Sequence, residues 1–283
     1  MDTEGHTAGQ DDSGAEPVRR FAVVREEATI AVSRGGRGRP LVLCPGLFST
    51  QADLAGLAGA LRAHFDVLTF DLRGHGRSSG AQRYRFASFL ADLEAVMSEL
   101  GRGSFPSAPV MAGHSMGADL VLHYAAAHPG AAAGLVLLDG ANPLPEPFLS
   151  GIEPAELRAM AEGMQAALAE VRGTERQVLL DVDDFVELNV EIDRLRVRLP
   201  DRLRGLELPV HVIASTAMAG RGDDDQTRWR NANWRAGFER LGAELPQAEV
   251  TWLDADHGLV VTHADRIAEM ILEAFGPDAR AGA

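Results

Sequence analysis

Short apolar runs alternate along the chain with longer segments in which apolar residues recur at helical spacing. The runs predict strands at residues 21–24, 29–32, 41–44, 67–71, 110–113, 135–139, 210–215 and 250–253. The longer segments predict helices at residues 51–64, 86–100, 116–127, 227–241 and 263–275. Continuous apolar runs such as 135–138 are typical of parallel strands that are buried on both faces. The pattern therefore predicts an α/β fold, with an eight-stranded, mostly parallel sheet, flanking helices and an antiparallel start.

One interval, residues 141–206, breaks this alternation. It contains helical patterns at 154–171 and 181–198, no convincing strand, and three prolines near its start. An insertion of this length between two core strands is more typical of a helical cap than of a structureless loop. We therefore expect a core of residues 18–140 and 207–283, a helical cap at 141–206 after the sixth strand, and a disordered leader at 1–17.

Composition narrows the classes of partner. The 283 residues are 46% hydrophobic and 24% charged, which is ordinary for a globular protein, and the net charge of −14 argues against nucleic acid and anionic membranes. No apolar run approaches the roughly 20 residues that span a bilayer, so no membrane insertion is expected. The start of the chain lacks the pattern of a secretory signal, and the single cysteine, Cys44, excludes an internal disulfide. We expect a cytoplasmic protein, as a monomer or homodimer.

Cofactor chemistry is narrowed in the same way. All 27 basic residues are arginine, so the chain has no lysine for a P-loop, a Schiff base or pyridoxal phosphate. No H-E-x-x-H motif and no clustered Cys/His set is present, so no metal is expected. The segment 71–80 nearly makes G-x-G-x-x-G, but Gly80 comes one residue late and no acidic ribose partner follows. We therefore expect no cofactor, and interpret His75 in this segment as a structural turn residue.

The most informative motif is Gly113-His114-Ser115-Met116-Gly117, which reads G-x-S-x-G. It follows one predicted strand and opens a predicted helix. A strand that turns this sharply into a helix leaves the serine hydroxyl exposed at the carboxyl edge of the sheet. The helix N-terminus behind the serine favours developing negative charge. Ser115 is therefore the candidate nucleophile.

Two further segments could serve such a serine. The turn at 44–48 can direct the backbone N–H of Leu47 at an oxyanion, together with the N–H of Met116. His257 follows the last predicted strand, and parallel strands end at the same edge of a sheet, so its imidazole can reach Ser115. Imidazole titrates near neutrality and suits proton transfer. His263 also lies near, but at the expected start of the last helix, and we favour His257.

Taken together, the turn at 45–48, the segment at 71–78, the Ser115 motif and the His257 loop resemble the α/β-hydrolase fold superfamily in content and order. Residues 71–117 are particularly similar to monoacylglycerol-lipase-like and lysophospholipase-like esterases. The resemblance implies a serine hydrolase that cleaves a small-molecule carboxylic ester, thioester or lactone through an acyl-enzyme. The alternatives are an acyltransferase or thioesterase of a biosynthetic pathway, and a lyase or ligand-binding protein on the same fold.

The acid of the triad departs from the pattern of most relatives, which carry an aspartate after the strand equivalent to 210–215. Met218 stands at about that place in this chain. Asp139, at the end of the sixth strand, matches the position that similar thioesterase domains use. Asp223, Asp224 and Asp225 are the alternatives, in a longer loop. We favour Asp139, because a strand end holds a carboxylate more rigidly than a glycine-flanked loop does.

The expected cap is rich in apolar residues. Phe148, Met160 and Met164 of this segment, with Phe48 of the turn, are the candidate substrate-pocket residues. Packing against the core would also explain them, but unbranched methionines suit a pocket for flexible acyl groups. We expect a hydrophobic cavity between the cap and Ser115, lined in part by Leu47, Phe48 and Met116.

Overall fold

The computed structural model describes residues 17–25, 27–101 and 105–277, so the expected leader lies outside the described residues except for Pro17. The strands are β1 (Arg19–Val24), β2 (Thr29–Gly35), β3 (Arg39–Cys44), β4 (Phe65–Phe70), β5 (Val110–His114), β6 (Gly134–Leu138), β7 (Val210–Ala217) and β8 (Ala248–Asp256). The helices are α1 (Ala55–Arg62), α2 (Phe86–Gly101), α3 (Met116–Ala127), α4 (Pro154–Ala169), α5 (Val182–Val197), α6 (Pro200–Leu203), α7 (Asp225–Glu244), α8 (Leu259–Thr262) and α9 (Ala264–Phe275).

The strands form one sheet in the order β1-β2-β4-β3-β5-β6-β7-β8. β2 pairs with β1 and β4 in the antiparallel sense, and every later pairing, from β4–β3 to β7–β8, is parallel. Every residue of β5 and β6 is buried, which explains their continuous apolar sequences. The predicted eight-stranded, mostly parallel sheet with an antiparallel start is confirmed.

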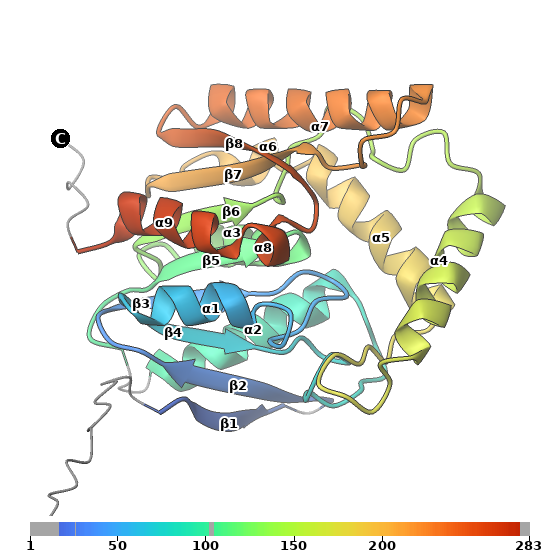
Figure 1. Cartoon of the computed structure of the whole chain (residues 1–283). Coiled ribbons are helices and arrows are strands. Elements are labelled where there is room, and N and C mark those ends of the chain that lie inside the picture. The colour runs from blue at the N-terminus through green and yellow to red at the C-terminus, as the bar shows by residue number, and fades with distance from the viewer. Residues whose placement is uncertain (1–16, 26, 102–104, 278–283) are drawn as a thin grey trace, which may run out of the picture.

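Helices cover both faces of this sheet (Figure 1). Alternate side chains of β3 point to opposite faces, so Leu41 and Leu43 pack with α1 and α9, whereas Val42 and Cys44 pack with α2, α3 and α7. Each face therefore has its own apolar core, and the carboxyl edge between the two layers is left for the loops. No helix in the described ranges is long and apolar enough to cross a bilayer.

The helix expected at 51–64 begins later, at Ala55. Residues 51–54 form turns, because the backbone N–H of Gln51 donates to the Asp71 carboxylate at 2.8 Å instead of starting a helix. Local apolar spacing cannot reveal this anchor, since Asp71 follows a different strand. The difference matters because it fixes the loop between β3 and α1 against the segment after β4.

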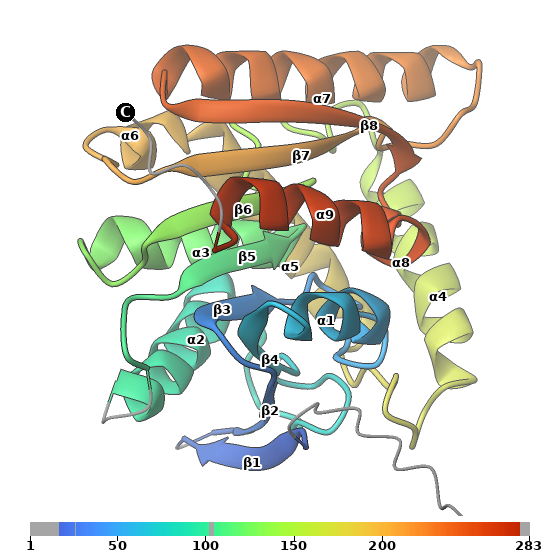
Figure 2. The same cartoon turned by 60° about the vertical axis from the view of Figure 1, so that its left-hand side comes forward.

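Between β6 and β7 the chain forms α4 and α5, as the helical patterns predict, and also the short helix α6, which was not predicted. We call this segment the candidate cap, or cap for short. Pro154 stands in the first turn of α4, where its missing N–H costs nothing, and Asp181 and Asp184 form a capping box at the start of α5. α4 and α5 lie side by side at one end of the sheet (Figures 1 and 2). The segment between α4 and α5, residues 170–181, is called the cap link. Backbone hydrogen bonds from Leu179 N–H to Gly74 O (2.7 Å) and from Gly76 N–H to Gln177 O (2.9 Å) attach it to the core.

Candidate active site

Ser115 occupies the sharp turn from β5 into α3. Its backbone has φ 52° and ψ −122°, outside the regions that L-residues normally adopt. The turn closes only because Gly117 follows, since a Cβ there would lie 2.4 Å from the carbonyl oxygen of Cys44. The local sequence therefore determines the placement of Ser115 at the end of β5.

The structure brings Ser115, His257 and Asp139 into one hydrogen-bonded row. His257 Nε2 lies 2.9 Å from Ser115 Oγ, and His257 Nδ1 lies 2.7 Å from Asp139 Oδ2. A carboxylate can only accept, so Nδ1 carries the proton and Nε2 is free to accept from the serine hydroxyl. Asp139 directly follows β6 and His257 directly follows β8, so the carboxyl ends of three strands supply the row.

Asp139 is fixed by further donors. Its Oδ1 accepts from Ser215 N–H (2.9 Å) and Trp234 Nε1–H (2.9 Å), and its Oδ2 accepts from the Ser215 hydroxyl (2.7 Å). Burial alone would raise the pKa of this carboxyl, but the hydrogen bonds from His257 and Ser215 outweigh burial and hold the pKa of Asp139 below its ordinary value. Sequence reasoning missed Ser215 and Trp234, which are far from Asp139 along the chain.

The other acidic candidates lie elsewhere. Asp224 caps α7 by accepting from Thr227 N–H at 2.9 Å, Asp225 pairs with Arg228, and Asp223 is exposed. The competing histidine, His263, directs Nδ1 at the Thr262 hydroxyl, 2.9 Å away. These placements leave Asp139 and His257 as the acid and base candidates beside Ser115.

The turn at residues 44–48, which is expected to bind an oxyanion, is held in place by a hydrogen bond to His75. Phe48 N–H donates to His75 Nε2 at 3.1 Å, so the opposite nitrogen, Nδ1, carries the proton and donates to Arg73 O at 2.8 Å. Burial lowers the pKa of His75 to about 4, which keeps the ring neutral and able to accept. His75 is thus a structural residue, as interpreted from the sequence, but its contact with Phe48 was not foreseen.

Leu47 and Met116 lie on the two backbone turns that meet beside Ser115. Gly46 allows the close approach, since a Cβ there would come within 3.0 Å of Ser115 Cβ. Met116 is the first residue of α3, where the backbone N–H has no acceptor inside the helix. Its amide is therefore available to a ligand at the end of the helix dipole that favours negative charge.

Backbone strain is concentrated at these turns. Within the described ranges, the non-glycine residues with positive φ are Phe48 (64°), Ser115 (52°), Asp139 (48°) and Ala141 (53°). Each costs of the order of 1 kcal/mol or more and persists only where its surroundings impose it. Three of the four belong to the row or to the Leu47 turn, so the strain coincides with the candidate site at the carboxyl edge of the sheet.

A second histidine supports the loop that carries His257. His114 Nε2 lies 3.0 Å from the backbone carbonyl of His257, and the two rings lie 4.9 Å apart. A carbonyl only accepts, so the His114 ring donates from Nε2. Burial lowers the pKa of His114 to about 3, so this ring is neutral and acts as a fixed donor to the loop.

A cavity of about 500 Å³ opens onto Ser115 and His257 and lies beneath α4 and α5. Its walls include the four predicted pocket residues, Phe48, Phe148, Met160 and Met164, and also Leu47. Further lining residues are Leu149, Leu157, Phe185, Asn189, Ile192, Asp193, Arg196, Met218, Ala219 and Arg230. The expectation that Met116 lines the cavity is wrong, because its side chain is buried in the core beneath the turn.

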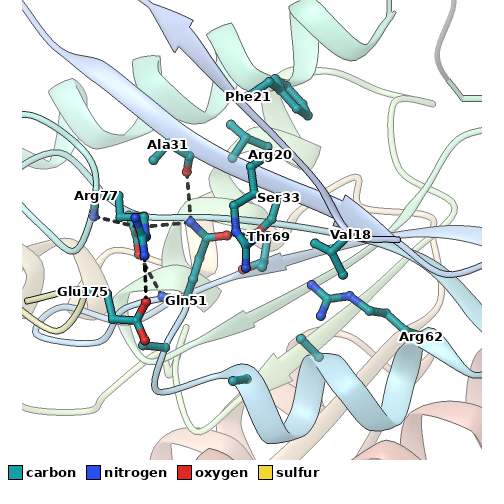
Figure 3. Close-up of a pocket in the computed structure, with 15 residues that line it drawn as sticks. Val18, Arg20, Phe21, Ala31, Ser33, Gln51, Arg62, Thr69, Arg77 and Glu175 are labelled. Carbon is teal, nitrogen blue, oxygen red and sulfur yellow. Dashed lines mark hydrogen bonds and ion pairs between the residues drawn. The ribbon is translucent and has the colours of Figure 1, made fainter. Parts of the chain in front are cut away.

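A smaller hollow lies away from this row, between the β1–β2 strands and α1 (Figure 3). It measures about 200 Å³, and several of the polar groups that line it bind one another. Arg77 pairs with Glu175 of the cap link at 3.1 Å, and the Gln51 amide donates to Ala31 O and to the Asp71 carboxylate. This region fastens the cap link to the core. Across the described part of the chain, no three His, Cys, Asp or Glu side chains gather as metal ligands would.

Comparison with known proteins agrees with the architecture. Residues 39–175 match the family described as alpha/beta hydrolase fold. The lipase LipV of Mycobacterium tuberculosis is 33% identical over 157 residues, 53% of this chain and 55% of the lipase. N-formylmaleamate deformylase of Pseudomonas putida is 35% identical over 107 residues, 37% of this chain and 38% of the deformylase. The chain thus matches about half or less of the length of these relatives.

Likeness to solved structures extends over nearly the whole chain. The thioesterase domain from the curacin biosynthetic pathway superposes with a TM-score of 0.63 over 91% of this chain and 99% of that domain, at 19% identity. Identity this low shows a shared fold and says nothing about a shared reaction. The sheet order, the matched family segment and the related hydrolases lead to one conclusion: the chain belongs to the α/β-hydrolase fold superfamily.

Proposed function

We propose that the protein is a serine hydrolase that cleaves a carboxylic ester, thioester or lactone through an acyl-enzyme. The observation that carries this proposal is the row Ser115–His257–Asp139, with contacts of 2.9 and 2.7 Å, at the mouth of a mostly apolar cavity. A serine hydroxyl is a weak nucleophile, and an adjacent base that is itself oriented by a carboxylate is the arrangement that activates it.

In the proposed reaction, Ser115 Oγ attacks the substrate carbonyl while its proton passes to His257 Nε2. The carbonyl oxygen becomes an oxyanion, which the backbone N–H groups of Leu47 and Met116 stabilise. His257 returns the proton to the leaving alcohol or thiol, and the acyl group remains on Ser115. Water then attacks the acyl-enzyme with His257 as base, which releases the acid and restores Ser115. Asp139 stays ionised throughout and holds the imidazolium.

The proposal is tested by labelling with a fluorophosphonate, which modifies only activated serines. We expect one label per chain on Ser115, and loss of labelling together with at least about three decades of esterase turnover in Ser115→Ala. Circular dichroism and the Tm of the variant control for folding. An unlabelled wild-type protein, or a Ser115→Ala variant with near-wild-type hydrolysis, would overturn the serine mechanism.

The position of the acid favours thioesters as the first substrates to assay. Asp139 follows β6, whereas most relatives place the acid after the next strand, and this resembles thioesterase domains. The acyl-enzyme could then pass to water or to another nucleophile, such as an amine or alcohol. Product analysis with and without an added acceptor separates hydrolysis from acyl transfer. A lyase or a passive binding protein on this fold would form no acyl-enzyme at all.

A further inference from the structure

The charged side chains that line the cavity differ in whether the protein supplies them with hydrogen-bond partners. Three charged side chains line it: Asp193, Arg196 and Arg230. The Asp193 carboxylate accepts from the backbone N–H groups of Phe148 (2.5 Å) and Leu149 (2.8 Å). Arg196 binds the buried carboxylate of Asp119 at 2.7 Å. These two residues are occupied by protein groups, so neither has its charge free for a ligand.

Arg230, on α7, is the exception. Its Nε and Nη2 atoms are buried, and neither has a hydrogen-bond partner among the residues that the structure describes. The guanidinium lies 5.7 Å from the centre of the Phe148 ring, which cannot replace an acceptor for two N–H groups. Arginine does not lose its proton in proteins, so this is a positive charge with a desolvated and unsatisfied edge. Such groups in native proteins require an explanation.

The two unsatisfied atoms lie on the same edge of the guanidinium. Nε–H and Nη2–H point in parallel, which is the geometry that holds both oxygens of a carboxylate. Arg196 demonstrates this use within the same cavity wall, because its Nε and Nη2 bind the two carboxylate oxygens of Asp119 at 2.7–3.2 Å. Arg230 presents the same edge with no carboxylate from the described protein opposite it.

We propose that Arg230 binds a carboxylate carried by the substrate, so that the protein acts on acyl compounds with a second, anionic end. This inference rests on the proposed serine mechanism, because it assigns the acyl group that Ser115 attacks. Arg230 lines the cavity and is partly exposed, and the proposed binding requires its guanidinium to rotate until the Nε–Nη2 edge faces the cavity. The methionines and phenylalanines that line the same cavity would contact the methylene chain.

The test compares two substrates that differ in one charge: p-nitrophenyl hemiadipate and p-nitrophenyl methyl adipate, in which a methyl ester removes the negative charge. We expect the wild-type protein to favour the anionic ester in kcat/KM. We expect Arg230→Gln to lower the ratio of the two kcat/KM values by about ten- to a hundredfold, as for loss of a charged hydrogen bond. Arg230→Lys retains the charge without the paired edge and should give an intermediate ratio.

The matched control is Arg228→Gln on the same helix, because Arg228 is exposed and paired with Asp225 at the surface. It should leave the ratio at the wild-type value. A wild-type protein without preference for the anionic ester, or an unchanged ratio in Arg230→Gln, would overturn the inference even while fluorophosphonate labels Ser115. If Ser115 is not labelled, the proposed function fails instead. Adipate then tests the site directly: it should raise the Tm of the wild-type protein and not that of Arg230→Gln, and equal shifts contradict the inference.

Discussion

At the scale of single residues, the hydrogen bonds around Asp139 hold its carboxylate in one orientation against His257. Its carboxylate accepts from four donors: His257 Nδ1–H, the Ser215 amide, the Ser215 hydroxyl and Trp234 Nε1–H. A carboxylate with this many donors cannot rotate without breaking several bonds at once. The imidazole that it holds is therefore fixed in one tautomer, the one that leaves Nε2 free to accept from Ser115.

Replacing Asp139 by Asn tests this role. An amide nitrogen cannot accept from a donor, so one of the N–H groups around the side chain loses its partner and His257 can adopt the other tautomer. We expect Asp139→Asn to lower kcat/KM for an activated ester by about three to four decades. The matched control is Asp224→Asn, which changes only the cap of α7 and should leave kcat/KM within about twofold. A crippled Asp224→Asn beside a mild Asp139→Asn would move the acid to the loop.

The sequence predicted those members of the candidate site whose signal is local, and the structure brings them together. Ser115 stands in a motif that itself makes the turn, and Asp139 and His257 follow strands whose apolar runs are plain. Ser215 and Trp234, which bind Asp139, carried no such signal, because their contacts depend on which strand and helix lie next to each other. The same holds for the position of Arg230 in the cavity wall. The hydrogen bond from Phe48 N–H to His75 is of the same kind, since it joins two loops 27 residues apart.

At the scale of elements, the two long helices of the cap differ in how they are held. α4 buries only Leu157 and Ala161, whereas α5 buries Leu188, Ile192, Asp193 and Arg196. α5 contacts α4 on one side and α2 on another. α5 therefore joins the cap to the core, and α4 forms the outer wall of the cavity through Met160 and Met164.

Because α4 forms a wall of the cavity, a larger side chain on its inner face should restrict the substrates that fit. Met160→Trp should narrow the cavity and lower kcat/KM for long acyl chains by about tenfold relative to acetyl esters. The physical reason is that added side-chain volume excludes methylenes that would otherwise be buried, at about 0.8 kcal/mol each. Ala167→Trp adds more volume on an exposed position of the same helix and is the control. Equal chain-length profiles in the two variants would show that α4 does not set the substrate range.

The role of α5 as a joint predicts a loss of stability. Arg196 and Asp119 link α5 to α3 by an ion pair in which the side chains are 10% and 2% exposed. Arg196→Met leaves a buried carboxylate unpaired, so we expect the free energy of unfolding to fall by about 3–5 kcal/mol. The double variant Arg196→Met/Asp119→Leu removes both charges and should recover most of that loss. Urea denaturation measures both, and a double variant no more stable than the single one would contradict the explanation.

At the scale of the whole molecule, all eight strands were predicted in chain order, and α/β topology followed from their alternation with helices. The predicted strand 250–253 proved longer, at Ala248–Asp256, because polar residues at its ends remain in register with β7. Apolar patterning detects burial, and it cannot detect backbone pairing at an edge strand that is partly exposed. Apolar patterning also could not predict the position of the cap over Ser115. Ion pairs and backbone hydrogen bonds between segments that are distant in the sequence determine that position.

Two buried histidines give the molecule a predictable response to acid. Burial lowers the pKa of His75 to about 4 and that of His114 to about 3, both below the value near 6.5 of the unfolded chain. Between pH 6.5 and about 4 the unfolded chain therefore binds more protons than the folded one. Stability is fully present above pH 6.5 and falls as the pH is lowered, by about 1.4 kcal/mol per pH unit for each histidine.

We therefore expect these two histidines to lower the free energy of unfolding by about 2–3 kcal/mol between pH 7.5 and pH 5.5, measured by urea denaturation. Burial also lowers the pKa of His123 and His211, which adds to the loss. Protonation of His75 should also disturb the candidate active site. A protonated His75 can no longer accept from Phe48 N–H, so the turn that carries Leu47 is released. His75→Gln keeps an acceptor and a donor without titrating, so it should reduce the difference between the two pH values by about 1.4 kcal/mol. His75→Gln could instead show the same difference in the free energy of unfolding between the two pH values as the wild-type protein. In that case His75 does not contribute to the acid response.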